Sequence, residues 1–430
     1  MATTLTKTDH ERRPSFLRHF SQESVPGERL ASLDALRGFT ILVMIFVNDV
    51  AGVRDAPGWM KHMQPANADG MTFVDLVFPA FLFIVGMSIP FALERRFERG
   101  EPRRNLWLHV LLRTLSLLII GVLMVNTEHI SDAGMLHRSL WTFLMYVGVV
   151  LVWLTPPARL SIPRSSLTAL RIAGVALLLI LAVLYRGPGE PGLIELRPYW
   201  WGILGIIGWS YLAACGAYLF FRKDTTALIG SMALLYCVYV AGASNYFSGW
   251  ITEWVNIGSI AAHGGLTVSG VVLGVMLLPG SRLETHGDRI KWALLYGLGL
   301  AAAGHLLHSA ADVHRIFIIN KIYATLPWCL WSAAITIWIW VPIYWLLDVI
   351  RNRRWTLILE HSGQNALLAY ILAPILYAAF AYSFFLMGTT NLYGALGGEL
   401  ATGLARSVIF AFAVVWAAAI LRRRGYLLKL

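Results

Sequence analysis

A short polar stretch between two apolar runs holds the side chains best suited to chemistry in this chain of 430 residues. It contains Lys61, His62, Asn67 and Asp69, and Asp75 follows within the first turns of the next apolar run. A neutral histidine is a suitable general base because its unperturbed pKa lies near operating pH. With Asp69 or Asp75 nearby, His62 could deprotonate an amine or a hydroxyl of an acceptor molecule. Taken alone, one histidine in a loop fits a structural role better.

Further polar side chains lie inside or beside apolar runs, where they are costly unless they are paired or face a cavity. Asn48 and Asp49 fall within the first apolar run. At the start of that run, Asp34 and Arg37 stand three residues apart and could pair across one helical turn. A second polar group lies beyond the eighth apolar run and comprises His305, His308, Asp312, His314, Arg315, Asn320 and Lys321.

A metal site is not expected from this second group. His305 and His308 would share one helix face, but no acidic residue stands at a convincing third spacing. Interfacial or hydrogen-bonded histidines are the better interpretation. Lys321, just before Pro327 and Trp328, indicates a loop that folds back over a cavity. A polar helix start further along fits either an interfacial cap or the lining of a site: Glu360, His361, Gly363, Gln364 and Asn365.

The composition places these residues in a membrane protein. Hydrophobic residues make up 57% of the chain and charged residues 14%, with a mean hydropathy of +0.63. A bilayer solvates that much apolar surface, whereas the core of a soluble domain could not hide it. A soluble enzyme and a nucleic-acid-binding protein are therefore excluded, although the net charge is +11. All three cysteines fall in apolar runs and indicate buried thiols.

The apolar runs predict an all-α fold, a polytopic transmembrane helical bundle with about twelve spans. A span needs roughly 17 to 25 mostly apolar residues. We expect a disordered cytoplasmic tail over residues 1–30 and one transmembrane domain over residues 31–425. The predicted spans cover residues 36–53, 71–93, 106–125, 140–154, 168–185, 200–221, 227–243, 260–278, 292–307, 326–347, 358–386 and 397–421.

The charge of the connecting loops predicts the orientation. Alternate loops and the C-terminal segment carry twenty basic residues, among them Arg95, Arg96 and Arg99, against seven in the opposite loops. Because cytoplasmic loops are enriched in lysine and arginine, the basic set is expected in the cytoplasm. An even number of spans then places both termini in the cytoplasm.

Two segments at the start of the chain resemble a known family. RLASLDALRGFTILVMIFVNDVAG (Arg29–Gly52) and GMTFVDLVFPAFLFIVGMSIP (Gly70–Pro90) are similar to the transmembrane heparan-α-glucosaminide N-acetyltransferase family and its bacterial relatives, the DUF5009 group. The matching positions are Ser32, Asp34, Arg37, Gly38, Asn48, His62 and the run from Asp75 to Phe81. Weaker similarity continues in GLTVSGVVLGVMLL, INKIYATLPWCLWSAAI and GQNALLAYIL, which begin at Gly265, Ile319 and Gly363.

The resemblance implies an acetyltransferase of the bacterial inner membrane, with acetyl-CoA from the cytoplasm as donor and an amino sugar or glycan, periplasmic or lipid-linked, as acceptor. His62 would be its catalytic histidine, and Asn48 and Asp75 would orient the histidine or the acceptor. Lys321 and Asn365 would line the acetyl-CoA or acceptor cavity, and Arg37 is a further candidate for binding acetyl-CoA. The resemblance also suggests a homodimer.

Departures from the family pattern bear on the acceptor. HMQPANADGMT has Asp69-Gly70 where the family often has Trp-Asn-Gly, and HRSLWTFLMYVG replaces the expected motif of the fourth span. The large luminal domain of the animal enzymes has no counterpart. Two alternatives stay open, a transporter of a small polar solute and a catalytically inactive interaction partner. Sequence symmetry that would favour a transporter is not visible.

Overall fold

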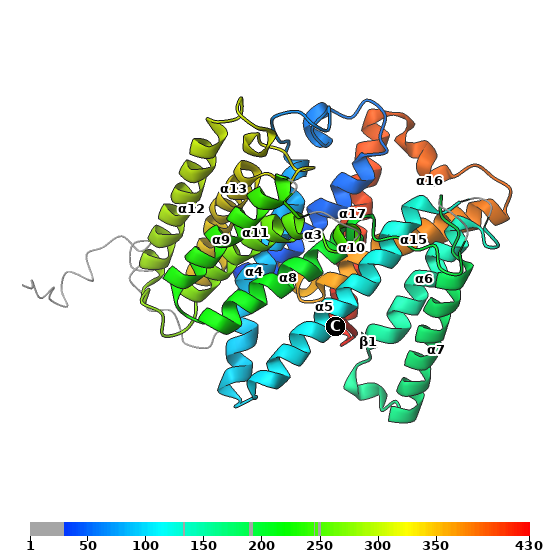
Figure 1. Cartoon of the computed structure of the whole chain (residues 1–430). Helices are drawn as coiled ribbons and strands as arrows, with labels where there is room; N and C mark the ends of the chain where they lie inside the picture. Colours follow the sequence, from blue (N-terminus) through cyan, green and yellow to red (C-terminus); the bar gives the residue numbers. More distant parts are fainter. Residues whose placement is uncertain (1–29, 132–133, 189–191, 245, 248–250) are drawn as a thin grey trace, which may run out of the picture.

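The computed structural model describes residues 30–131, 134–188, 192–244, 246–247 and 251–430, which form a bundle of long helices (Figure 1). The tail expected over residues 1–30 lies outside this part of the chain except for Leu30. Eleven of the described helices are long and apolar enough to span a membrane. These are α3 (Ala31–Val50), α4 (Val74–Glu98), α5 (Arg103–Asn126), α7 (Arg164–Leu184), α8 (Gly202–Phe221), α9 (Thr225–Ala243), α11 (Ile257–Met276), α12 (His286–His308), α13 (Leu326–Tyr344), α15 (Ala366–Leu386) and α17 (Leu400–Arg423).

The prediction of a polytopic helical membrane protein is confirmed, and all twelve predicted apolar segments fall on helices. One of them, α6 (Arg138–Trp153), has 16 residues and is shorter than a full span. Three further helices are short, namely α10 (Ile251–Trp254), α14 (Leu357–Gly363) and α16 (Leu392–Ala395). The strands β1 (Leu154–Thr155) and β2 (Leu427–Leu428) pair antiparallel and attach the C-terminal segment to the end of α6.

The helices α3, α4, α11 and α13 make up the centre of the bundle. Helix α11 packs on α4, α8 and α9, and α13 packs on α3, α4, α11 and α12. Helices α6 and α7 form a pair at one edge of the molecule, on the opposite side from α12 (Figure 1). Most of α7 is exposed and apolar, including Ile172 and Leu179, as expected for a helix that faces lipid.

Small residues let α4 and α11 approach closely. A Cβ added to Gly86 would overlap the carbonyl oxygen of Thr267, and one added to Gly270 would overlap the carbonyl oxygen of Phe83. Association of helices in a membrane depends on van der Waals packing, which small residues improve because they bring the backbones together. This contact fixes α11 against the helix that carries Asp75.

The predicted span over residues 358–386 is wrong as one continuous helix, because it is divided into α14 and α15 at Gln364 and Asn365. The reason is tertiary. Gly363 sits so close to α3 that an added Cβ would overlap the carbonyl oxygen of Asp34. The side chain of Asn365 forms hydrogen bonds with the C-terminal segment, and the backbone at this residue does not continue the turn of α14.

Contacts near the helix ends define two ends of the bundle. At one end, which we call the basic end, Glu94 pairs with Arg222 at 2.7 Å. At the other, which we call the His62 end, the N–H of Gly70 donates to the carbonyl of Ile319 at 2.8 Å. Each pair joins segments that the alternation of charge assigns to the same side.

Candidate active site

His62 and Asp75 are in direct contact at the His62 end. Nδ1 of His62 lies 2.7 Å from Oδ1 of Asp75, and the side chains are 49% and 3% exposed, respectively. A carboxylate only accepts hydrogen bonds, so Nδ1 of the neutral imidazole carries the proton and Nε2 carries the lone pair. The imidazole is thereby oriented, with its basic nitrogen directed away from Asp75.

The carboxylate of Asp75 is held by the chain on both sides of it. Its Oδ2 accepts from the backbone N–H groups of Met63 at 3.1 Å and Thr72 at 3.0 Å. The Thr72 hydroxyl donates to the carbonyl of Lys61 at 2.7 Å, which fastens the residue before His62 to the start of α4. The loop therefore fixes the position of both partners in the pair.

Lys321 completes this group from a distant part of the chain. Its Nζ lies 3.2 Å from Nδ1 and 3.3 Å from Nε2 of His62, 259 residues earlier in the sequence. Burial lowers the pKa of Lys321, and the negative charge of Asp75 opposes that shift. A cation beside an oriented imidazole could stabilise negative charge that develops at the same place.

Asn320 and Asp69 join the loop that carries His62 to the segment between α12 and α13. The Asn320 side-chain amide donates to the carbonyls of Ala66 and Ala68, both at 2.9 Å. Asp69 lies 2.7 Å from Nε2 of His308, which ends α12. Because Asn320 is 3% exposed and directly precedes Lys321, these bonds place the lysine against His62.

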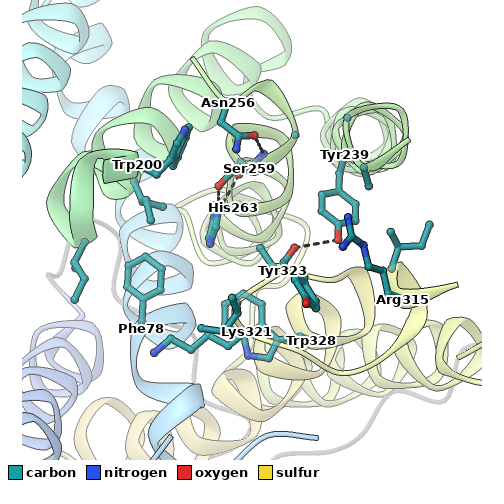
Figure 2. Close-up of a pocket in the computed structure, with 18 residues that line it drawn as sticks. Phe78, Trp200, Tyr239, Asn256, Ser259, His263, Arg315, Lys321, Tyr323 and Trp328 are labelled. Atoms are coloured by element: carbon teal, nitrogen blue, oxygen red, sulfur yellow. Dashed lines mark hydrogen bonds between the residues drawn. The ribbon is translucent and has the colours of Figure 1, made fainter. Parts of the chain in front are cut away.

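Lys321 also lines a cavity of about 490 Å³ at the His62 end, shown in Figure 2. Aromatic side chains form much of its wall: Phe78, Trp200, Tyr239, Tyr323 and Trp328. His263 enters it from α11 and faces the space between Phe78 and Lys321 (Figure 2). We call this space the His62-side cavity. Its size and mostly apolar lining are those of a small-molecule site, for which roughly 300–1,000 Å³ is usual.

A second cavity of about 510 Å³ opens toward the basic end, and we call it the basic-side cavity. Four cationic residues line it: Arg37, Arg96, Arg113 and Lys429. Ile203 on α8 lines both cavities. The two spaces therefore share one apolar lining residue, and their polar lining groups differ.

The predicted residues Arg37 and Asn365 both line the basic-side cavity. Arg37 donates to Ser88 Oγ at 2.5 Å and to the Gly363 carbonyl at 3.2 Å, and it pairs with Asp34 at 3.3 Å. The pairing of Asp34 with Arg37 expected from their spacing is thus present. The guanidinium joins α3, α4 and the break before α15 at the cavity wall.

Asn365 holds the C-terminal segment at this cavity. Its Nδ2 donates to the Tyr426 carbonyl, and its Oδ1 accepts from the N–H of Leu428, both at 3.1 Å. Its side chain therefore holds the segment that follows α17 in place at the cavity.

Asn48 is not brought to His62 by any contact in the described part of the chain. Its side chain is exposed on α3 and makes no hydrogen bond there. The neighbouring Asp49 is instead buried, with Tyr377, Tyr393, Arg406 and Ser407 bonded to its carboxylate. This network ties α3 to α15, α16 and α17, and it explains how a carboxylate is accommodated at this depth.

The described residues contain no cluster of three or more histidine, cysteine, aspartate or glutamate side chains that could hold a metal ion. His308, considered as half of a metal pair, bonds to Asp69 instead. Sequence reasoning missed His263, because a single histidine in a run of small apolar residues carries no spacing signal. It also missed the role of Asn320, which depends on contacts with a loop more than 250 residues away.

The fold and the site define a multi-span membrane protein with an oriented histidine at one end and a cation-lined cavity at the other. Residues 29–246, just over half of the chain, match the family described as "Domain of unknown function (DUF5009)", and the chain belongs to that family. The matched region includes Arg37, His62 and Asp75, whereas Lys321 and Asn365 lie beyond it.

Two curated proteins are distant relatives over part of their length. Human heparan-alpha-glucosaminide N-acetyltransferase is 31% identical over 150 residues, which cover 33% of this chain and 22% of the human protein. The mouse protein of the same name is 35% identical over 101 residues, 24% of this chain and 14% of its own length. The chain thus spans about a fifth or less of the relatives that it matches.

Proposed function

We propose that this protein is a membrane acetyltransferase that takes an acetyl group from acetyl-CoA and transfers it to a saccharide. The basic end would face the cytoplasm of a bacterium and the His62 end the periplasm, so that the acetyl group crosses the inner membrane. The observation that carries the proposal is the contact of His62 with Asp75 and Lys321 beside the His62-side cavity. The name of the distant relatives is consistent with it.

The residues at the His62 end suit acyl transfer. Asp75 keeps the proton on Nδ1, so Nε2 of His62 can take a proton from the acceptor amine or hydroxyl. The acceptor attacks the thioester carbonyl, and the carbon–sulfur bond breaks as the amide or ester forms. Coenzyme A leaves as a thiolate and takes up the proton that His62 received. The Lys321 ammonium is placed to stabilise the oxyanion of the tetrahedral intermediate.

The same groups support a relay through the histidine. Nε2 of His62 would attack the thioester first, releasing the coenzyme A thiolate and forming an acetyl-imidazole. The acceptor would then take the acetyl group and restore the imidazole. Brief mixing with labelled acetyl-CoA in the absence of acceptor separates the two routes. Label on the His62 peptide indicates the relay, and its absence indicates direct transfer.

The basic-side cavity is the proposed donor site. Acetyl-CoA carries phosphate groups at one end and a thioester at the end of a long, flexible arm. Arg37, Arg96, Arg113 and Lys429 supply cations at the cavity wall. Arginine and lysine side chains bind phosphates well, and a cation-lined cleft concentrates an anionic ligand. The arm would extend toward Ile203, which also lines the cavity that contains Lys321.

The experiment that tests the proposal is acetyl transfer by the purified protein in detergent, with labelled acetyl-CoA and a panel of sugars. We expect wild type to label a sugar and His62→Ala to lose roughly 10² to 10⁴ in rate, the usual contribution of a general base. His305→Ala is the matched control, because that histidine is exposed at the same end and makes no side-chain hydrogen bond in the described residues.

A transporter remains the rival because the two cavities share Ile203. Such a protein would move a sugar across proteoliposomes without acetyl-CoA, and acetyl-CoA would not raise its melting temperature. Label transfer that depends on His62, together with stabilisation by acetyl-CoA, supports the enzyme. Unchanged transfer in His62→Ala would refute the proposed chemistry.

A further inference from the structure

We infer that the His62-side cavity binds an anionic saccharide unit, one that carries a carboxylate or a phosphate, and that His263 and Arg315 recognise it. The inference rests on the proposed function, because it names the class of acceptor. Neither residue was assigned a role by the acyl-transfer chemistry. Figure 2 shows the side chains concerned around the cavity.

His263 presents a hydrogen-bond acceptor to the cavity. Its Nδ1 lies 2.9 Å from the carbonyl oxygen of Ser259, one turn earlier on α11. Because a carbonyl only accepts, Nδ1 carries the proton and Nε2 carries the lone pair. Nε2 has no partner among the described residues, and the ring points into the cavity (Figure 2). A buried polar group of this kind needs a donor from a ligand or from water. A sugar hydroxyl supplies one.

The remaining polar groups of the cavity are mainly donors or cations. Arg315 and Lys321 both line it, and none of the described lining residues is an aspartate or a glutamate. The charge of Lys321 is offset by Asp75 through His62. The guanidinium of Arg315 lies over the Tyr323 ring, 5.2 Å from its centroid, and forms no ion pair with a described carboxylate. Arg315 is exposed, so its charge is accessible to a ligand at the cavity.

The aromatic walls and two indole groups agree with this assignment. The Nε1–H groups of Trp200 and Trp328 are buried without a hydrogen-bond partner in the described structure, and both residues line the cavity. The apolar face of a pyranose ring can pack on such rings. The cations Arg315 and Lys321, with no carboxylate among the described lining residues, favour a ligand rich in acceptor oxygens. A free ammonium group would meet like charge and have no carboxylate partner.

Binding without acetyl-CoA tests the inference separately from turnover. Titration calorimetry would compare glucuronate and glucose 6-phosphate with the neutral glucose and the cationic glucosamine, using wild-type protein in detergent. We expect both anions to bind roughly two- to fivefold more tightly than glucose, the scale of an exposed ion pair, and glucosamine to bind more weakly than glucose. Tighter binding by glucuronate alone identifies a carboxylate site, and by glucose 6-phosphate alone a phosphate site. Both results support an anion site.

Substitutions then assign the preference. Arg315→Gln should remove the tighter binding of the anions and leave glucose binding intact. Arg315→Lys should keep the tighter binding of the anions. His263→Phe keeps an aromatic ring at this position and should weaken the binding of all four sugars to a similar extent. Arg138→Gln, at an exposed arginine of the same end outside the cavity, should change none of them.

The failures of this inference and of the proposed function differ. Tighter binding of glucosamine than of glucose, or an anion preference that survives Arg315→Gln, overturns the anionic acceptor, even if acetyl transfer depends on His62. Conversely, binding of anionic sugars as expected, with no transfer by wild type, leaves the cavity assignment standing and removes the acetyltransferase.

Discussion

Replacement of Asp75 by asparagine tests the pairing on which the proposed chemistry depends. Asparagine has the shape of aspartate but only one acceptor oxygen. That oxygen is held toward Met63 and Thr72, whose two N–H groups would otherwise be left unpaired in a buried place. Each unpaired donor costs roughly 1–3 kcal/mol. The amide N–H₂ of the introduced asparagine would therefore face His62 and require its Nδ1 to accept.

The consequence is the wrong tautomer of His62. With Nδ1 accepting, Nε2 carries the proton and cannot take another from the acceptor. In the variant, the reactive tautomer lacks the charge-assisted hydrogen bond that Asp75 accepts in wild type, and reaching this tautomer breaks the hydrogen bond from the asparagine amide. The combined cost is about 2–4 kcal/mol in the transition state. This corresponds to a fall in kcat of roughly 30- to 1,000-fold. The KM for acetyl-CoA should not change, because Asp75 does not line the basic-side cavity.

The assay is steady-state acetyl transfer by four proteins, namely wild type, Asp75→Asn, His62→Ala and the double variant. If Asp75 acts through His62, adding Asp75→Asn to His62→Ala has no further effect on kcat. Asp312→Asn is the matched control, since Asp312 is exposed at the same end and bonds to no described side chain. A wild-type kcat for Asp75→Asn, or an equal loss of rate in the His62→Ala background, would refute this reasoning.

Two further predictions concern the pKa of Lys321 and the packing of the core. Burial lowers the pKa of Lys321, so as pH rises its amine loses its proton earlier than that of a solvent-exposed lysine. Labelling with acetic anhydride, followed by mass spectrometry, should reach its half-maximal rate at lower pH for Lys321 than for exposed lysines, and an equal or higher midpoint would contradict the burial. Gly270→Val should destabilise the folded protein by roughly 1–3 kcal/mol, because its Cβ would meet the Phe83 carbonyl. Thermal unfolding in detergent measures this, with Gly299→Val as the control because Gly299 has open space around it, and equal melting temperatures of the two variants would contradict the close packing.

Most of the fold could be predicted because a bilayer imposes a length and a composition on each span. The predicted range over residues 227–243 differs from α9 (Thr225–Ala243) by two residues at one end. The division between α14 and α15 could not be predicted, since it follows from contacts of Gly363 with α3 and of Asn365 with the C-terminal segment. Nothing local in the sequence encodes those partners.

The site was predictable where its parts are near in sequence. His62 and Asp75 stand 13 residues apart, on either side of a loop that must turn back, and they are in contact. Lys321 was expected, with Asn365, to line the acetyl-CoA or acceptor cavity, and the structure places it beside His62 rather than beside Asn365. Its position depends on Asn320, which reaches the carbonyls of Ala66 and Ala68. Hydrogen bonds to backbone carbonyls leave no residue pattern that one sequence could reveal.

The separation of polar groups between the two cavities bears on how one protein could transfer an acetyl group and still keep the membrane sealed. The donor carries several negative charges, and the cavity at the basic end has three arginines in its lining, whereas the other cavity has Arg315 alone. The residue that lines both cavities is Ile203, which offers no polar group to an ion or to a phosphate. Moving a charged group past such a residue is costly. Under the proposed function, the uncharged acetyl thioester is the part of the donor that can approach Lys321, and the charged nucleotide stays where its cations are.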